Sequence, residues 1–370
     1  MTEAEPDMPA DGNWGPRGTA GVSFAAAMSF EGVDVHLGGR HVLDNLSLVL
    51  RPGEIVCLLG ESGSGKSTIL RVAAGIQRVG AGIVRINDEV VSGPGLHVPP
   101  ERRGIGFMFQ DFALFPHYTL LENVAFGLRR LGRAEARNQA HQALRRVGLD
   151  GREKDYPHML SGGQQQRLAL ARTIAPRPGL LMLDEPFSSL DARLRESVRG
   201  ETLAVLRETH ATTVVVTHDP EEAMVLGDRI ALLRRGRIVQ IDRASAVYAR
   251  PVDLSAARFL SPLSEIAARV RDGRAETPLG SVAAPGRADG DRVVVAVRPV
   301  GAVTMSEEAP GVPARILAKR DAIGVDLCEV QVQGLERPLG LRQWSNPRFS
   351  PGRDVFLRLN PEHVLVFDPD

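Results

Sequence analysis

Cysteine, lysine and aromatic residues are scarce in this chain of 370 residues, and long apolar runs are missing. The two cysteines, Cys57 and Cys328, lie far apart, so neither a disulfide framework nor a cysteine metal site is expected, and a reducing compartment fits. No segment approaches the roughly 18 consecutive apolar residues of a membrane-spanning helix, so work at a membrane would require docking to a partner. The 45 basic and 45 acidic residues balance, which leaves no bulk positive charge to attract nucleic acid.

Composition and the spacing of apolar residues divide the chain into three parts. Residues 1–27 are rich in Pro, Gly, Ala and acidic residues and lack the basic start and apolar centre of a secretory signal, which predicts a disordered leader. Residues 28–255 alternate apolar runs with helical patterns, which predicts an α/β domain. Residues 260–370 contain short alternating strands between Gly- and Pro-containing turns, as in a small all-β barrel or sandwich.

Short apolar or β-branched runs in the α/β part are typical of buried parallel strands. They lie at residues 55–59, 105–109, 180–183 and 212–216. Helices are predicted over residues 119–150 and from Gly162 onward.

The stretch that organises the chain follows the first of these strands and leads into a helix. It consists of Gly60, Glu61, Ser62, Gly63, Ser64, Gly65, Lys66, Ser67 and Thr68. Strand, glycine-rich turn and helix in this order are typical of a phosphate-binding P-loop, because glycines let backbone N–H groups turn toward a polyphosphate. We expect Lys66 to reach the β- and γ-phosphates and the Ser67 hydroxyl to bind Mg²⁺. A plain Gly/Ser turn before a helix is the alternative.

A second strand ends in two carboxylates, Asp184 and Glu185. The carboxyl ends of parallel strands meet at one edge of a sheet, so we expect both side chains beside the P-loop. Asp184 is expected to hold Mg²⁺ directly or through water, and Glu185 to orient and deprotonate the attacking water. Acidic residues end many strands, but the position after a P-loop favours this catalytic interpretation.

The run Leu160-Ser161-Gly162-Gly163-Gln164-Gln165-Gln166-Arg167 admits two interpretations. By itself it is a helix start with Ser161 as N-cap. However, Gln110 follows an upstream strand, Ser188-Ser189-Leu190-Asp191 follows the carboxylates, and His218 follows the next strand. With these residues in this order, the run resembles the signature motif of the ATP-binding cassette (ABC) family.

The resemblance covers roughly residues 29–250 and implies an ATPase with ATP and Mg²⁺ as cofactors. A RecA-like core would carry a helical signature subdomain at about residues 111–175. Two copies would face each other head to tail, so that Ser161, Gly162 and Gly163 of one copy contact the γ-phosphate held by the other. The resemblance assigns nucleotide contacts also to Gln110, Asp191 and His218. It gives the catalytic set as Lys66, Gln110, Glu185 and His218, and the metal ligands as Ser67, Gln110 and Asp184.

One position departs from the family pattern. Where an aromatic residue usually stacks on adenine, this chain has Leu37. Either His36 or His41 could stack on the base instead, or apolar contact alone could hold it.

Two further segments resemble parts of importer ATPases. Phe112, Leu114 and Phe115 resemble the wall of a groove that accepts a helix of a membrane permease, with simple core packing as the alternative for each. Residues 260–370 resemble the OB/TOBE-like regulatory domain that follows many importer cassettes.

Three functions therefore compete. The first is the ATPase subunit of an importer at the cytoplasmic face of the bacterial inner membrane, with a permease and, indirectly, a substrate-binding protein as partners. The second is a soluble cassette ATPase, which usually has two cassettes or a coiled-coil insertion. The third is a binding protein with an inactive P-loop, against which Lys66, Glu185 and His218 argue. The chain resembles ferric-iron importer subunits most, and importers of polyamine, sulfate, thiamine or sugar share nearly all of its features.

Overall fold

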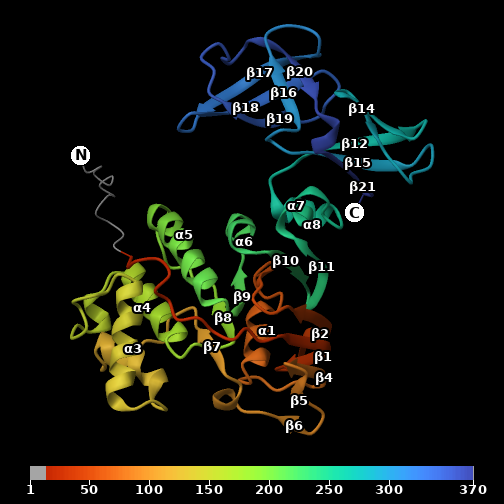
Figure 1. Ribbon diagram of the computed structural model, residues 1–370. Coiled ribbons are helices and arrows are strands. Elements are labelled where there is room, and N and C mark those ends of the chain that lie inside the picture. Colours follow the sequence, from red (N-terminus) through yellow and green to blue (C-terminus); the bar gives the residue numbers. More distant parts are fainter. Residues whose placement is uncertain (1–13, 370) are drawn as a thin grey trace, which may run out of the picture. The chain divides into compact units, whose positions relative to one another are not determined.

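The computed structural model describes residues 14–369, and the chain divides into two compact units, Met1–Ala244 and Ser245–Asp370 (Figure 1). The division falls earlier than the expected limit of the first domain at residue 255. Helices α7 (Ala244–Ala249) and α8 (Leu254–Leu260) account for this difference, because they group with the second unit. Among the described residues, the helices are all too short or too polar to cross a membrane.

The first unit contains two sheets and a group of helices. Its strands are β1 (Met28–Leu37), β2 (Arg40–Leu50), β3 (Ile55–Leu59), β4 (Ala81–Ile86), β5 (Glu89–Gly93), β6 (Leu96–His97), β7 (Ile105–Met108), β8 (Leu180–Asp184), β9 (Thr212–Thr217), β10 (Arg229–Arg234) and β11 (Arg237–Arg243). Its α-helices are α1 (Lys66–Ala73), α2 (Leu120–Ala125), α3 (Arg133–Arg146), α4 (Gly162–Ile174), α5 (Ala192–Thr209) and α6 (Pro220–Leu226). Short 3₁₀ turns are η1 (Pro100–Arg102), η2 (Phe126–Leu128) and η3 (Pro157–Met159).

The central sheet has the strand order β11-β10-β3-β9-β8-β7. Strands β10, β3, β9, β8 and β7 are parallel, and β11 pairs antiparallel with β10. Every residue of β3, β8 and β9 is buried, as expected for parallel strands with both faces covered. The parallel order brings the carboxyl ends of β3, β7, β8 and β9 to one edge, where the chain continues into the predicted site residues.

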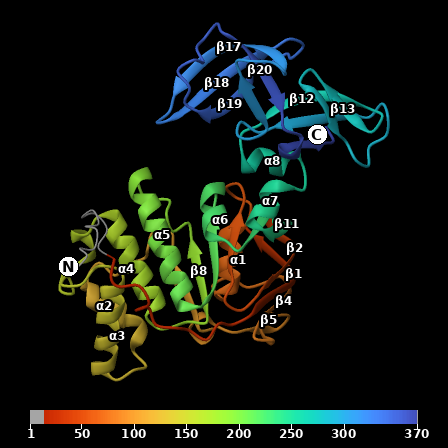
Figure 2. The same ribbon diagram turned by 45° about the horizontal axis from the view of Figure 1, so that its top comes forward.

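An antiparallel sheet, β2-β1-β4-β5-β6, packs with α1 and the central sheet around one core. Val35 of β1, Leu58 of β3 and Leu70 of α1 are fully buried in this core. Figures 1 and 2 show this sheet on the opposite side of the first unit from helices α2, α3 and α4.

Helices α2, α3 and α4 share a separate apolar core that includes Val124, Leu144 and Leu168. The prediction of one helix over residues 119–150 is wrong, because α2 and η2 end at Leu128 and α3 begins only at Arg133. The break comes at a turn that leads into Gly132, which has extended backbone angles at the N-cap of α3.

The predicted leader lies only partly within the described residues, since residues 1–13 fall outside them. Residues 14–27 are bound along the first unit rather than loose (Figures 1 and 2, red). The backbone N–H groups of Gly15, Ser23 and Ala26 donate to carbonyl groups of the folded core, at N···O distances of 3.0, 2.8 and 3.1 Å. Trp14 packs against the core of the helical group. Backbone hydrogen bonds and packed side chains therefore both attach residues 14–27 to the first unit.

The second unit is a β structure built on two antiparallel sheets, β14-β13-β12-β15-β21 and β16-β20-β17-β18-β19. Its strands are β12 (Ser264–Arg271), β13 (Arg274–Thr277), β14 (Gly280–Ala283), β15 (Arg292–Val297), β16 (Val303–Ser306), β17 (Val312–Asp321), β18 (Val325–Val332), β19 (Leu339–Trp344), β20 (Asp354–Leu359) and β21 (Val364–Phe367), with one 3₁₀ turn, η4 (Pro361–His363). Both sheets contribute to a single core that contains Val295 and Val330, so the predicted all-β class is confirmed. Cys57 and Cys328 are each buried, in different units.

Candidate functional site

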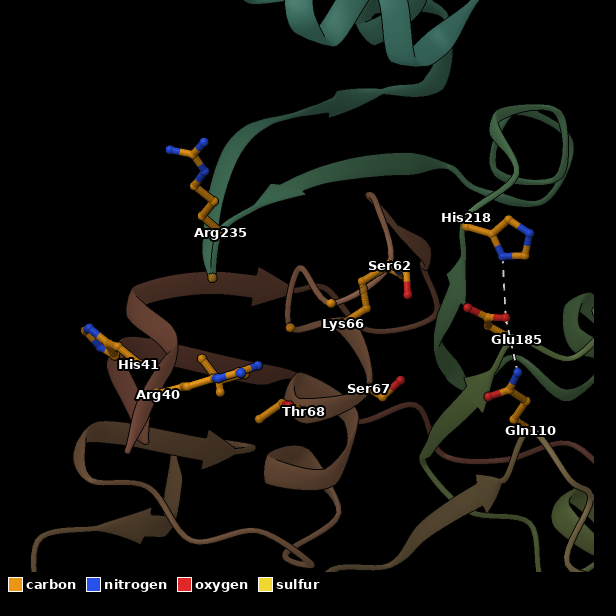
Figure 3. A pocket seen from close by; sticks show the side chains of 14 residues that line it. Arg40, His41, Ser62, Lys66, Ser67, Thr68, Gln110, Glu185, His218 and Arg235 are labelled. Atoms are coloured by element: carbon orange, nitrogen blue, oxygen red, sulfur yellow. Dashed lines mark hydrogen bonds and ion pairs between the residues drawn. The ribbon is translucent and has the colours of Figure 1, made fainter. Parts of the chain in front are cut away.

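A cleft of about 850 Å³ opens at the carboxyl edge of the central sheet, where the P-loop joins β3 to α1. Its lining residues are Arg40, His41, Val42, Ser62, Gly63, Gly65, Lys66, Ser67, Thr68, Gln110, Glu185, His218, Arg235 and Gly236. Figure 3 shows the P-loop side chains between two groups, with Gln110, Glu185 and His218 on one side and Arg40, His41 and Arg235 on the other. The structure thus brings together residues separated by almost the length of the first unit.

The P-loop backbone wraps around the amine of Lys66. Lys66 Nζ donates to the carbonyl oxygens of Gly60 and Glu61 at 2.7 and 2.8 Å. Burial lowers the pKa of Lys66, and the nearby carboxylates of Glu185 and Asp184 oppose this effect. Gly65 has a φ of 108°, and a Cβ there would lie 2.9 Å from the carbonyl oxygen of Val42, so the loop requires glycine at this position.

Ser67 and Asp184 form the oxygen-rich floor of the cleft. Ser67 Oγ donates to Asp184 Oδ1 at 2.9 Å. Burial raises the pKa of Asp184, because a buried carboxylate is costly to ionise. A hydroxyl and a carboxylate are the hard oxygen ligands that Mg²⁺ prefers, and a bound cation would offset the cost of ionising Asp184. This pair therefore fits Mg²⁺.

Gln110, Glu185 and His218 come from three different strand ends and lie in a row (Figure 3). Glu185 Oε2 accepts from Gln110 Nε2 at 3.4 Å and lies 3.4 Å from His218 Nδ1. Glu185 has a φ of 44°, a left-handed conformation that turns its side chain into the cleft. Its backbone is held by donation of its N–H to the carbonyl of Val216 at 3.1 Å.

Behind His218 lies a buried carboxyl group that sequence reasoning missed. Glu222, on α6, accepts a hydrogen bond from the Thr217 hydroxyl at 2.6 Å. Burial raises the pKa of Glu222. Its position in the sequence, four residues after His218, was the available signal.

Among the described residues, the predicted signature does not line this cleft of its own chain. Ser161 is the N-cap of α4, and its hydroxyl accepts from the backbone N–H of Gln164 at 3.4 Å, as the simpler interpretation of the motif expects. Ser161 and Gly162 are exposed, and a Cβ added at Gly162 would meet no atom within 4 Å. Asp191, predicted as a nucleotide contact, is the N-cap of α5 and accepts from the backbone N–H of Leu194 at 3.0 Å.

The side of the cleft opposite Glu185 includes two arginines that sequence reasoning missed, Arg40 and Arg235. Each lies in or directly after a glycine-containing hairpin turn, which was the only signal available. Leu37 does not line the cleft, but His41 does, and its ring stacks on that of His36 with centroids 4.2 Å apart.

Comparison with known proteins gives the site its context. A family described as ABC transporter matches residues 43–188. The chain is 45% identical to the Fe(3+) ions import ATP-binding protein FbpC of Streptomyces coelicolor over 276 residues. This alignment covers 74% of this chain and 78% of that protein. The chain belongs to the ABC transporter family. Like other ATP-binding proteins of this family, it is an ATPase, and the resemblance inferred from the motifs is confirmed.

Two further similarities bear on substrate and fold. The cassette is 44% identical to the spermidine/putrescine import ATP-binding protein PotA of Methylococcus capsulatus, over 69% of this chain and 66% of that one. It also resembles the solved dimeric structure of the ATP-binding cassette MJ0796 in a post-hydrolysis state bound to ADP and Pi. The TM-score is 0.53 at 31% identity, and the match covers 59% of this chain and 98% of that chain. The ABC fold predicted for the first unit is thus confirmed.

Proposed function

We propose that this chain is the ATP-hydrolysing subunit of a ferric-iron importer. The observation that carries the proposal is the cleft itself. It contains both Lys66, proposed to bind phosphate, and the contacting side chains of Gln110, Glu185 and His218. The cargo follows from similarity to proteins named for Fe(3+) import, at 38–45% identity over 74–85% of this chain. The alternative cargoes are sulfate and polyamine. The chain is 46% identical to a sulfate/thiosulfate import protein over 60% of its length, and it is also similar to the spermidine/putrescine import protein.

In the proposed reaction, the P-loop N–H groups and Lys66 bind the phosphates of ATP. Ser67 and Asp184 would hold Mg²⁺, with Gln110 as a further ligand, and a bound ion would neutralise charge on the phosphates. Glu185 orients the attacking water and accepts its proton. His218 donates a hydrogen bond to the γ-phosphate, and its 3.4 Å contact with Glu185 places both groups at the same end of the cleft.

We infer that the site is completed by a second copy of the chain. The exposed Ser161 and Gly162, at the start of α4, offer a hydroxyl and the first backbone N–H of the helix to an anion. Gly163 is buried, so it would contribute only a backbone N–H in the first turn of α4, while Asp191 approaches the nucleotide from the partner. The dimeric state of the similar MJ0796 structure supports the arrangement.

We place the chain at the cytoplasmic face of the inner membrane, docked to permease subunits that receive cargo from a substrate-binding protein. The contact surface proposed for the permease follows Gln110 and is aromatic: the Phe115 ring lies 4.5 Å from that of Phe126 and 5.4 Å from that of Tyr118. Phe126 is partly exposed, whereas Phe112 is buried and is not part of this surface.

The catalytic assignment is tested with Glu185→Gln. This variant should bind ATP and accumulate as a dimer on size-exclusion chromatography, with steady-state hydrolysis reduced at least about 100-fold, because the general base is removed. Glu89→Gln, at an exposed residue of β5, is the matched control and should hydrolyse ATP normally. Rapid turnover by Glu185→Gln would reject the assignment.

The cargo is tested by uptake into cells from which this chain has been deleted. We expect uptake of labelled ferric iron to fall and to be restored by the wild-type chain but not by Lys66→Ala. Uptake of labelled spermidine and sulfate serves as the comparison. Loss of either of these with unchanged ferric-iron uptake would replace iron by that alternative.

A further inference from the structure

The loop that carries Gln110 has a strained backbone. Two residues beyond Gln110, Phe112 has a φ of 62°, and the next residue, Ala113, has a φ of 44°. Residues other than glycine rarely occupy this left-handed region, and each such residue costs on the order of 1–3 kcal/mol. Two in succession persist only if contacts from elsewhere in the fold hold them.

Arg172 supplies those contacts from the last turn of α4. Its Nη2 donates to the carbonyl oxygen of Phe112 at 2.6 Å, and its Nη1 donates to that of Ala113 at 2.7 Å. The guanidinium carbon also lies 5.4 Å from the centroid of the Phe115 ring. Burial lowers the pKa of Arg172, and its charge is directed at two carbonyl groups, which makes strong charge-assisted hydrogen bonds.

Arg172 and the two carbonyl groups that it binds are called the clamp below. Helix α4 connects this clamp to the signature motif. The helix has 13 residues and begins at Gly162, so Arg172 lies on the same rigid rod as the proposed γ-phosphate contact. At the other end of the clamp, Gln110 reaches Glu185 at 3.4 Å. A continuous path of covalent structure and hydrogen bonds therefore runs from the signature to the proposed general base.

We infer that Arg172 is a positioning residue for ATP hydrolysis: it holds the strained loop so that the position of the signature helix sets the position of Gln110 against Glu185. The inference rests on the proposed role of Gln110, and not on the cargo. It is distinct from a purely structural role, in which Arg172 would only attach the helical group to the central sheet.

The helical group offers a control outside the proposed site. Arg146, on α3, is also buried, donates to the Glu208 carboxylate at 2.9 and 2.6 Å, and has its guanidinium carbon 6.0 Å from the centroid of the Trp14 ring. None of these contacts involves the Gln110 loop. Arg146→Met therefore removes a buried guanidinium from the helical group without changing the contacts of Arg172.

The experiment measures steady-state ATP hydrolysis by the full chain as a function of ATP and Mg²⁺. We expect Arg172→Met to lower kcat about tenfold or more, since a displacement of roughly 1 Å at a reacting group can cost 100-fold, with KM for ATP within about threefold. The Mg²⁺ concentration for half-maximal activity should rise. Arg146→Met should lower thermal stability but change neither of these kinetic quantities. Equal kinetic losses in the two variants would overturn the inference.

A second variant tests the strain directly. Ala113→Gly removes one methyl group and lets the backbone take a positive φ without penalty. Ala113→Gly should therefore restore part of the kcat lost in Arg172→Met, while having little effect in the wild type. In a Gln110→Ala background, Arg172→Met should cause little further loss. Absence of rescue, together with additive losses in the Gln110→Ala background, would show that Arg172 does not act through this loop. If Glu185→Gln retained full activity, the catalytic assignment would fail instead, which keeps the two failures distinguishable.

Discussion

Arg103 should be among the most sensitive positions of the first unit, although it lies outside the cleft. Its guanidinium is buried, and it donates to the carbonyl oxygens of Val72 and Ala73, at the C-terminal end of α1, at 2.9 and 2.8 Å. It also donates to the carbonyl oxygens of Val98 and Val91 at 2.8 and 2.9 Å. A bond of 2.6 Å to the Ser92 hydroxyl completes the set. The side chain therefore joins the helix behind the P-loop to the antiparallel sheet.

The cost of removing Arg103 follows from these bonds. A hydrogen bond to a charged group contributes about 1.5–3 kcal/mol, and each buried carbonyl left unpaired costs on the order of 1–3 kcal/mol. Removal of the charge also recovers a desolvation cost, which shows in the pKa of Arg103, lowered by burial to about 10. For Arg103→Met we therefore expect a net loss of roughly 3–5 kcal/mol in the free energy of unfolding, because several buried carbonyls lose their donor and the recovered desolvation offsets part of that loss.

The assay uses the distribution of tryptophan. The chain contains only Trp14 and Trp344, one in each unit. In a Trp344→Phe background, urea unfolding followed by tryptophan fluorescence reports on the first unit alone. Arg102→Met, at the exposed neighbouring residue, is the control and should lie within about 0.5 kcal/mol of the parent. A loss below about 1 kcal/mol for Arg103→Met would refute the view that its bonds hold α1 to the sheet.

Three other positions give further predictions. Gly65→Ala should weaken ATP binding at least about tenfold, measured with a fluorescent ATP analogue, because its Cβ would lie 2.9 Å from the Val42 oxygen; wild-type affinity would contradict this. Arg146→Met should cost roughly 3–5 kcal/mol in the same urea assay, because Glu208 loses its oppositely charged partner and bonds of 2.9 and 2.6 Å. Adding Glu208→Gln should recover part of the loss. Burial alone would raise the pKa of Asp326, but hydrogen bonds to a backbone N–H and a lysine hold it at about 2. The second unit should therefore keep this stabilisation above the ordinary pKa of 3.8 and lose it as pH falls toward 2, as followed by acid unfolding, whereas Asp326→Asn should lose that dependence.

Much of the central sheet and the phosphate side of the cleft could be predicted from the sequence, because their signals are local. A buried parallel strand is an uninterrupted apolar run, and the loop before Lys66 needs glycines at fixed spacing. The strand order then brings Glu185 and His218 together without further information. The break at Gly132 was missed because no local signal marks it. The apolar pattern continues across this position, and the helical propensity of single residues does not fix where a helix ends.

Contacts between segments far apart in the chain could not be predicted. Trp14 packs beneath a helix that begins more than a hundred residues later, and nothing in its neighbourhood indicates that partner. Arg103 and Arg172 are likewise two among many arginines, and only the fold shows that they donate to backbone carbonyls rather than to carboxylates. In a chain with so many arginines, the sequence does not indicate which of them have structural roles.

Backbone strain is found at both ends of one long hydrogen bond in the site. Glu185, at one end, has a φ of 44°, and the left-handed pair beyond Gln110 lies near the other. The bond between Gln110 and Glu185 is 3.4 Å long, so it contributes little to hold these strained segments in place. Contacts with phosphate are charge-assisted and stronger, and can therefore outweigh it. Arg172 fixes the Gln110 loop to α4, whereas the position of that loop relative to Glu185 is held only weakly. Alternative positions relative to Glu185 should therefore differ in energy by only a few kcal/mol, which is the range that nucleotide binding can shift.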